Sequence, residues 1–444
     1  SAFAHRWFLA FTKNSPVQAH ILARKFIQKI ELSQNAHLLE LANTPILLNL
    51  TCLVFKSIED FPTNPSELYK QALDLLLVSW DEARGIKRDQ VYRNLSLLDK
   101  IKLLSQIAAI SFKQGNYFIT AHQIQQIIAN YLSNLPNAVT DTDALEIASN
   151  AVLSAIEIQH GLLIERARGI YSFSHLSFQE YFTARAIVAN ANQETLQDFV
   201  KHLHEQRWRE VFLLSVRMLN SADNLLQLMQ SKIDELARNS HQLYKFLKWL
   251  QQKSSQVNTG YHCASVRAFY LTISLPPEHP LACNQDLAIS LDRQLAGSLD
   301  EQLAIDLALT HALAVSLTMT ADIFFQRMMV LKLSLDLKYL FTNQPSWQLH
   351  LQDLANQLPD ASQDRDTLKI WWQTYGKTWS DKLRSLIIQT RQIGYNWQFT
   401  EQDWHCLQQY WDANKLILEC LNTATNLSPD VKNLIENNLF LPPE

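Results

Sequence analysis

The sequence predicts a mainly α-helical protein, and its low glycine content is the first reason. The chain has 8 glycines among 444 residues, whereas a usual share of about 7% would give roughly 30. Tight turns, phosphate loops and strand–helix connections all use glycine, so a chain this poor in it should consist mainly of long helices. Frequent Leu, Ala and Gln favour helices as well. A single short β-hairpin is the expected exception.

The N-terminal part is expected to form a helical domain of residues 1–60. Thr44 and Pro45 predict a helix start, because threonine is a good N-cap and proline suits the first helical position. The turn-rich sequence Phe61–Glu67 then marks a domain boundary. The apolar pattern before Thr44 predicts helices over residues 2–11, 16–30 and 37–42. Since the apolar start has no initiator Met, we expect the chain to be cut from a longer one.

Residues 61–190 combine helices with the hairpin. Two short apolar runs, Leu162–Ile164 and Ile170–Phe173, flank the turn residues Ala167–Gly169, which predicts two paired strands. A helix follows the hairpin. Four helices are expected before the hairpin. The first begins after Ser66, and the others span residues 97–112, 121–132 and 144–159. This order of elements suggests a winged-helix domain.

From residue 191 the chain is expected to be helical to its end, with a middle region of residues 191–345 and a C-terminal domain of residues 346–444. The sequence Phe341–Ser346 has the composition of a linker between them. Leucines recur every fourth residue over residues 287–307, and such a stripe drifts about 40° per step, too far for one straight helix. We therefore expect Gly297 to divide it into two helices that pack on each other.

Composition and charge exclude several classes of protein. A net charge of −4 gives no basic footprint for nucleic acid. The apolar stretch Ile46–Phe55 is much shorter than the roughly 20 residues of a membrane span, and no signal peptide is recognisable. The five cysteines are scattered without a CxxC pair, which is typical of reduced thiols. We expect a cytoplasmic protein that does not enter membranes and is unlikely to bind nucleic acid.

The most distinctive segment is Tyr171–Ala189 (YSFSHLSFQEYFTARAIVA). Ser177 and Glu180 have the spacing of a capping box, which predicts a helix that starts at Ser177. His175 would then lie just outside a helix N-terminus, where an imidazole can donate to a phosphate; on spacing alone, a hydrogen bond to nearby backbone remains the alternative. The expected buried stripe is Phe178, Phe182, Ala186 and Ala189.

This segment closely resembles the end of the winged-helix domain in NACHT proteins, the STAND-class ATPases that include animal NLR receptors. ELANTPILLNLTCLVF (Glu40–Phe55) resembles their first helical domain, and residues 61–89 resemble the start of the winged helix. The sequence from WWQTYGKTWSDKLRSLI (Trp371 onward) to the end is similar to the C-terminal helical region of bacterial, particularly cyanobacterial, NACHT proteins. The resemblance implies the part downstream of the nucleotide-binding core.

The resemblance also implies functional residues and partners. In that family a proline at the position of Pro45 packs near the adenine, and a histidine at the position of His175 contacts the β-phosphate of bound ADP and helps hold the closed state. Pro45 can equally serve only as a helix start. ADP or ATP with Mg²⁺ is implied for the full-length protein, with no tight binding to this chain alone. The implied partners are an upstream nucleotide-binding domain, further copies in an active oligomer and an unknown protein trigger, by analogy in antiphage defence.

No catalytic or metal-binding residue is predicted in the chain. Gly376-Lys377-Thr378 ends like a phosphate loop, but Trp371 stands where the first glycine is needed and no strand precedes it. The chain alone should therefore not hydrolyse ATP. His202–Glu205 and Trp404–Cys406 contain metal-capable side chains without a complete ligand set.

A different class of function remains open: a helical protein-interaction scaffold, or a winged-helix DNA binder, with no nucleotide role. Against DNA binding, the helix that would enter a groove, around Phe178–Ala189, is largely apolar and has Arg185 as its only strong base.

Overall fold

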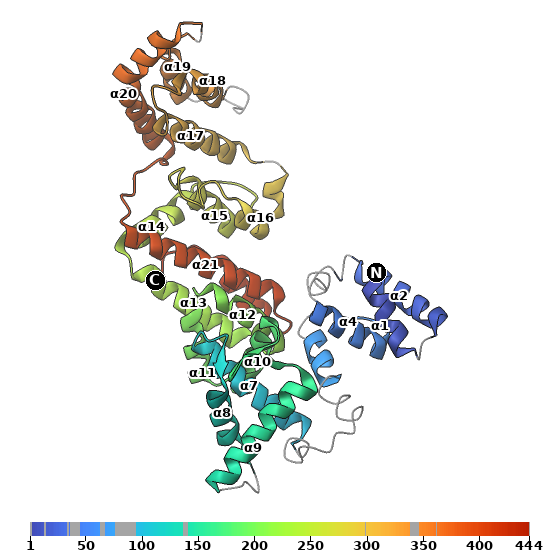
Figure 1. The fold of residues 1–444 in the computed structure, drawn as a ribbon. Coiled ribbons are helices and arrows are strands. Elements are labelled where there is room, and N and C mark those ends of the chain that lie inside the picture. The colour runs from blue at the N-terminus through green and yellow to red at the C-terminus, as the bar shows by residue number, and fades with distance from the viewer. Residues whose placement is uncertain are drawn as a thin grey trace. The chain divides into compact units, whose positions relative to one another are not determined.

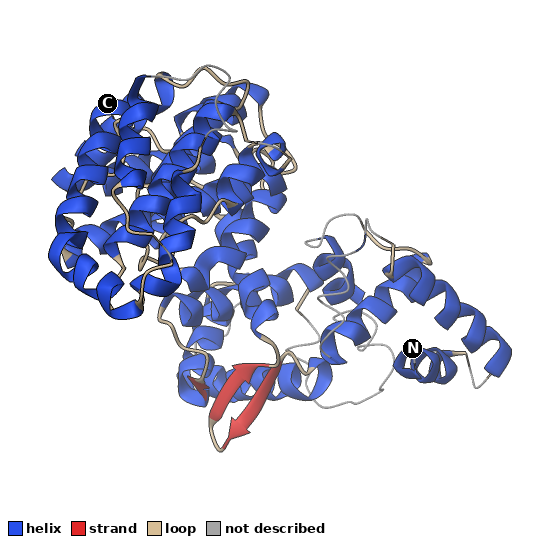
Figure 2. Ribbon diagram, turned by 90° about the horizontal axis from the view of Figure 1, so that it is seen from above, coloured by secondary structure: helices blue, strands red, loops and turns tan. Residues whose placement is uncertain are grey.

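A computed structural model describes residues 2–12, 15–32, 35, 45–62, 67–75, 95–135, 141–297, 299–337, 346–360 and 362–443, except for the side chains of residues 45, 46, 159 and 160. Apart from one three-stranded sheet, the regular structure in these ranges is helical (Figure 2), so the prediction of a mainly α protein with a small hairpin is confirmed. The chain divides into two compact units. Ser1–Leu228 with Glu419–Ser428 form unit 1, and Met229–Leu418 with Pro429–Glu444 form unit 2. The four domains expected from the sequence stay a prediction.

The N-terminal helices of unit 1 pack around a cluster of aromatic rings. Neighbouring ring centroids in this cluster lie 5.3 to 6.1 Å apart, mostly edge to face, an arrangement that aromatic side chains favour. The cluster consists of Phe8, Phe26, Phe55 and Phe61. The helices are α1 (Ala2–Phe11), α2 (Pro16–Ile30) and α4 (Pro45–Ile58). Their predicted bounds and the helix start at Pro45 are confirmed, whereas the short helix expected at residues 37–42 lies outside the described residues.

The rest of unit 1 contains the winged-helix elements. Residues 67–75 are helical and are followed, beyond residues 76–94, by α7 (Leu97–Lys113), β1 (Ile119–Thr120), α8 (Ala121–Ser133), α9 (Thr142–Ala155), β2 (Leu163–Ala167), β3 (Ile170–Phe173) and α10 (Leu176–Ala189). The predicted hairpin is β2–β3, and it turns at Gly169, whose φ of 72° suits glycine. The sheet order is β1-β3-β2. Strand β1 was not predicted, because two residues carry no alternating pattern.

Helix α10 lies at the centre of this unit. It packs against α7 and α12 (Arg209–Met218), beside which it is drawn in Figure 1. The short α11 (Gln193–Phe199) connects α10 to this part of the chain. The segment after residue 418 returns to the unit, where the Ser428 amide donates to the Asp223 carboxylate at 2.9 Å. Through these contacts α10 buries half of its 14 residues.

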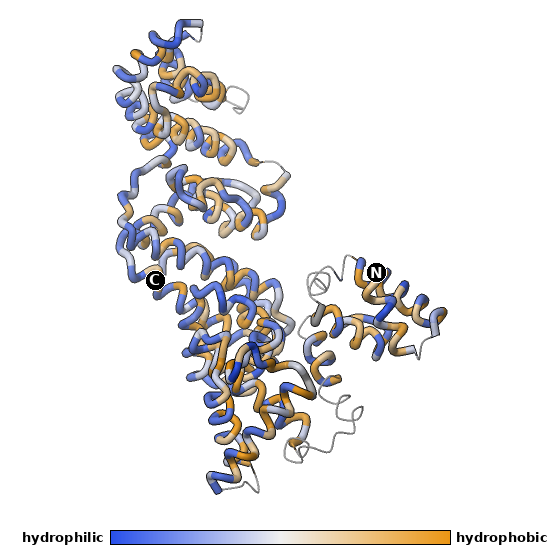
Figure 3. The backbone as a smooth tube through the Cα atoms, viewed as in Figure 1, coloured by the Kyte–Doolittle hydropathy of each residue, from blue (hydrophilic) through white to orange (hydrophobic). Residues whose placement is uncertain are grey.

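Unit 2 is helical throughout its described residues, and hydrophobic and hydrophilic residues alternate along most of its helices (Figure 3), as expected of helices with one buried face. Gly297 follows a short 3-10 turn between α16 (Asp286–Leu291) and α17 (Glu301–Leu317), so the predicted division of the leucine stripe is confirmed. The predicted packing of these two helices on each other is wrong: α16 packs chiefly on α15 (Cys263–Ile273), and α17 on α18 (Phe324–Leu335) and α20 (Arg365–Arg391). The expected linker 341–346 lies almost entirely outside the described residues. The other helices of the unit are α14 (His241–Ser255), α19 (Ser346–Asn356) and α22 (Pro429–Asn438), and two helices are shared with unit 1, α13 (Asp223–Arg238) and α21 (Glu401–Thr423).

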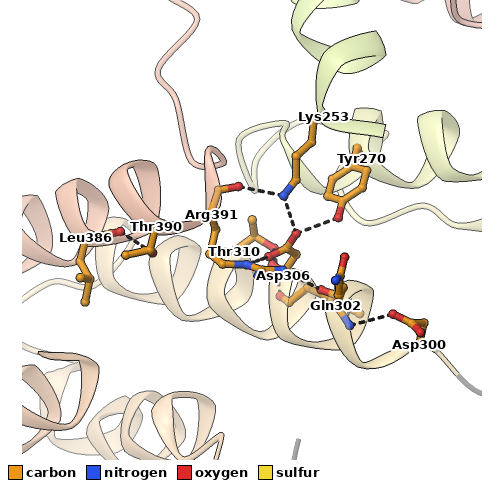
Figure 4. Close-up of polar contacts among 10 residues, drawn as sticks. Lys253, Tyr270, Asp300, Gln302, Asp306, Thr310, Leu386, Thr390 and Arg391 are labelled. Atoms are coloured by element: carbon orange, nitrogen blue, oxygen red, sulfur yellow. Dashed lines mark hydrogen bonds and ion pairs between the residues drawn. The ribbon is translucent and has the colours of Figure 1, made fainter. Parts of the chain in front are cut away.

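A buried ionic cluster joins four helices of unit 2. The Asp306 carboxylate on α17 accepts hydrogen bonds from Lys253 Nζ at 3.0 Å, Arg391 Nε at 2.6 Å and the Tyr270 hydroxyl at 2.8 Å (Figure 4). The Asp306 side chain is fully buried and that of Lys253 is 6% exposed. Lys253 Nζ also donates to the Arg391 carbonyl at 2.8 Å. One carboxylate thus serves two cations that come from α14 and α20.

Among the described helices, none is long and apolar enough to cross a membrane.

Candidate functional site

His175 stands between the sheet and α10. It follows β3 and is the N-cap of α10, with extended backbone (φ −143°, ψ 144°). The backbone before it is fixed by the hairpin, because the Ser174 amide donates to the Leu162 carbonyl at 2.8 Å. The ring is half-buried, and its centroid lies 6.4 Å from that of Phe178 in an edge-to-face contact. Strand and helix therefore fix both the position and the tilt of the imidazole.

The hydrogen bond of the ring decides which nitrogen carries the proton. The Ser177 amide donates to Nδ1 of His175 at 3.2 Å, so Nδ1 is unprotonated and the neutral ring carries its proton on Nε2. Burial holds the pKa of His175 below its ordinary value, which keeps the ring neutral at pH 7. Within the described part of the chain, no residue hydrogen-bonds Nε2. His175 thus presents one oriented donor.

The residue before His175 carries a second polar group. The Ser174 hydroxyl is buried and has no hydrogen-bond partner among the described residues. A buried hydroxyl without a partner is uncommon in folded proteins. Ser174 and His175 together place two donor-capable side chains at the N-terminus of a helix of 14 residues, where the helix dipole favours an anion.

The capping box expected at Ser177 is wrong. The N-cap of the helix is His175 rather than Ser177, because the His175 ring accepts the hydrogen bond of the Ser177 amide. The Ser177 hydroxyl instead hydrogen-bonds Tyr69, a residue of the helix at 67–75. The predicted buried stripe is also only partly right. Phe178 and Phe182 are fully buried, but Ala186 is half-buried, Ala189 is exposed and the enclosed helix buries further side chains (Gln179, Tyr181, Thr183, Ala184 and Ile187).

Two carboxylates face each other where α10 packs on α12. Burial first, and then the neighbouring carboxylate of Glu210, raise the pKa of Glu180 to about 7. Glu210 lies 3.8 Å from Arg209, which in turn donates to Glu419 at 2.7 Å. This pair could not be predicted from the sequence, since Glu180 and Glu210 are 30 positions apart and come together only through helix packing.

Two family models match the chain. Residues 65–187 match the winged helix-turn-helix domain C-terminal to NACHT, and residues 347–442 match the NACHT C-terminal helical domain 2. The chain is the downstream part of a NACHT-domain protein. Both domain types follow a NACHT domain, which implies an upstream NACHT nucleotide-binding domain in the same protein. No curated protein and no solved structure gives a significant match.

In this NACHT protein the first matched range contains the hairpin, His175 and most of α10, whereas Pro45 precedes it. Pro45 is the first residue of α4, and its side chain lies outside the described residues. The structure therefore places the backbone of Pro45 at a helix start, and its contact with adenine stays a prediction.

The Gly-Lys-Thr sequence of the NACHT protein lies inside α20. Gly376 is in the middle of this helix, where a Cβ atom would lie 2.6 Å from Cδ2 of Trp372. The glycine is thus needed for close packing of an indole ring rather than for a phosphate loop. His202 is likewise engaged within the fold: its Nδ1 lies 2.5 Å from Glu205, and its ring stacks on Trp208 at 4.3 Å. In the described ranges no three metal-capable side chains come together.

Proposed function

We propose that this chain is the regulatory and sensor part of a NACHT-type STAND signalling ATPase. In this proposal the winged-helix domain helps to hold ADP in the closed, inactive state. Opening then permits ATP exchange and assembly of an active oligomer. The observation that carries the proposal is the orientation of His175: its Nδ1 accepts from the Ser177 amide, so Nε2–H is left as the donor at the start of α10.

The residues present fit a phosphate group. A neutral imidazole offers one N–H, the adjacent serine offers one O–H, and the N-terminus of α10 supplies a favourable dipole. A hydrogen bond to a charged group contributes about 1.5–3 kcal/mol, enough to bias a closed state but too little for this chain to bind nucleotide tightly by itself. The cofactor we propose for the full-length protein is therefore ADP or ATP with Mg²⁺, held mainly by the upstream domain.

DNA binding has less support. Because α10 packs against both α7 and α12 and buries half of its residues, little of its surface is left to enter a groove, and the recognition helix of a helix-turn-helix protein needs such a surface. The other alternative is a protein-interaction scaffold that binds no nucleotide, and the experiment below distinguishes it from the proposed role. Bacterial conflict signalling such as antiphage defence, with a protein trigger sensed by the C-terminal helices, is proposed from the family resemblance alone.

The test is the nucleotide content of the purified full-length protein. We expect the wild type to retain ADP and His175→Ala to retain markedly less, with higher basal signalling. His202→Ala is the matched control, because it removes a half-buried histidine outside the site and should retain ADP. Equal ADP occupancy and equal basal signalling in wild type and His175→Ala would refute the role of His175. A wild type that carries no nucleotide and does not bind added ADP would favour the scaffold.

A further inference from the structure

Unit 2 contains a pocket of about 390 Å³ whose lining is unusually aromatic. Its walls come from α17, α20, the segment after α15 (residues 274–278) and the segment between α20 and α21 (residues 394–399). Four aromatic residues line it: Tyr395, Trp397, Phe399 and Trp404. The volume lies in the range of small-molecule sites, which are concave, mostly apolar and carry a few polar groups.

Three of the lining residues have hydrogen-bonding atoms without partners. Ser274 Oγ, Arg384 Nε and Trp397 Nε1 are each buried and make no hydrogen bond with the described residues. The N–H groups of Arg384 and Trp397 can only donate, and the hydroxyl can donate as well. Folded proteins leave few buried polar groups unpaired, and each one calls for an explanation. Three such groups around one pocket indicate a ligand that supplies acceptor oxygens.

The pocket is held in shape by contacts between its walls and the neighbouring helices. Trp249 Nε1 donates to the Gln392 carbonyl at 2.9 Å, and Gln242 Nε2 donates to the Trp397 carbonyl at 3.4 Å. Gly394 has a φ of 79°, and a Cβ there would lie 2.9 Å from a methyl group of Leu313 on α17. The segment 394–399 is thus pressed onto its neighbours, and the site is formed before a ligand arrives.

The charges of the lining select among anions. Arg384 is in no ion pair with the described residues, so its guanidinium has no counter-charge of its own. Glu278 is the one acidic residue among the described lining residues. One cation suits a single negative charge, and the carboxylate of Glu278 repels an anion of higher charge. A phosphate, with about −1.5 to −2 charges at pH 7, would be in excess.

We propose that this pocket binds a carboxylate carried on an apolar or aromatic group. The Arg384 guanidinium and the Trp397 indole N–H donate to the carboxylate oxygens, with Ser274 as a third donor. The aromatic walls hold the remainder of the ligand. The carboxylate belongs either to a small free acid or to the C-terminus of a peptide. This site is independent of His175 and of nucleotide, and it gives the chain a recognition chemistry for a signal molecule.

Ligand-observed NMR with the 444-residue chain tests the proposal. The probes are benzoate, phenylacetate, indole-3-acetate, N-acetylphenylalanine and the tripeptide Ala-Ala-Phe, each compared with its primary amide. We expect at least one acid to bind at least tenfold more tightly than its amide. Preference for the tripeptide over the small acids identifies a chain terminus as the source, and the reverse identifies a small molecule.

Variants locate the binding. Arg384→Met removes the donors and keeps the stem, and it should weaken the preferred acid at least tenfold. Trp397→Phe keeps an aromatic ring but lacks the N–H, and it should weaken the acid severalfold. Lys382→Met, an exposed position on the same helix, should have no effect. The proposal is overturned if no acid is preferred over its amide, if Arg384→Met binds the acid as well as the wild type, or if inorganic phosphate displaces it. The acid–amide comparison on the wild type tests the preference for a carboxylate even if a variant does not fold.

Discussion

Replacing Asp306 by Asn should destabilise unit 2 more than any other single charge removal in the cluster. Asp306 is fully buried and accepts from Lys253, Arg391 and Tyr270. Asparagine keeps the shape and one acceptor oxygen but removes the only anion. Lys253 and Arg391 are then left as two cations without a counter-charge. Breaking a buried ion pair by removal of one partner costs about 3–5 kcal/mol, and we expect a loss in the free energy of unfolding of this size.

Lys253→Met should cost less, about 1–2 kcal/mol. It removes the ion pair of Lys253 with Asp306 and a hydrogen bond to the Arg391 carbonyl, but Asp306 keeps Arg391 as its counter-charge. Burial lowers the pKa of Lys253 although Asp306 opposes the shift, which shows that its buried charge is costly already. The double variant should lose less than the sum of the two single losses, since it leaves one unpaired cation rather than two.

The assay is urea unfolding followed by tryptophan fluorescence, because most of the chain's 11 tryptophans belong to unit 2. Two units need not unfold together, so the transition of unit 2 is fitted separately. Asp381→Asn, an exposed position on α20, is the control and should change stability by less than about 0.5 kcal/mol. A loss below about 1 kcal/mol for Asp306→Asn, or a larger loss for Lys253→Met, would show that the cluster is not held by its charges.

Two further substitutions test packing and titration. Gly376→Ala in α20 would normally stabilise a helix by about 0.5–1 kcal/mol, but its Cβ meets the Trp372 ring at 2.6 Å. Overpacking should instead cost about 1–3 kcal/mol in urea unfolding, whereas Ser385→Ala, at an exposed position of the same helix, should be nearly neutral. For Glu180, the folded-state pKa of about 7 exceeds the ordinary value of 4.5 for a glutamate. The contribution of the protonated Glu180 side chain to the free energy of unfolding is therefore fully present below pH 4.5, and it is lost as the pH rises through about 7. Glu180→Gln should match the wild type near pH 4.5 and exceed it at pH 8 by up to about 3 kcal/mol; equal stability at both pH values would contradict the raised pKa.

Local signals in the sequence predicted much of the fold. The bounds of α1 and α2 and the start of α4 follow from apolar periodicity and from a proline at the first helical position. The hairpin follows from two apolar runs around Gly169. The helix start at Ser177 was wrong because two capping patterns overlap there, and the histidine ring takes the amide that a serine cap would have left free.

What depends on distant pairs could not be predicted. Asp306 meets Lys253 and Arg391 from positions 53 and 85 residues away, as the numbering shows. The pocket around Arg384 joins two connecting segments more than 100 residues apart. No periodicity within one helix reports such meetings. His175 could be singled out from the sequence and the family resemblance, but the tautomer of its ring could be assigned only from the structure.

The central proposal is that Nε2–H of His175 contacts a phosphate of bound ADP, and the most direct test compares two nucleotides. Affinities for ADP and AMP are measured by calorimetry on the full-length protein, for the wild type and His175→Ala. Loss of a hydrogen bond to a charged group of about 1.5–3 kcal/mol corresponds to an affinity roughly 10- to 150-fold weaker. The account predicts this loss for ADP and an unchanged affinity for AMP, which lacks the β-phosphate. Equal losses for both nucleotides, or no loss for ADP, would contradict it.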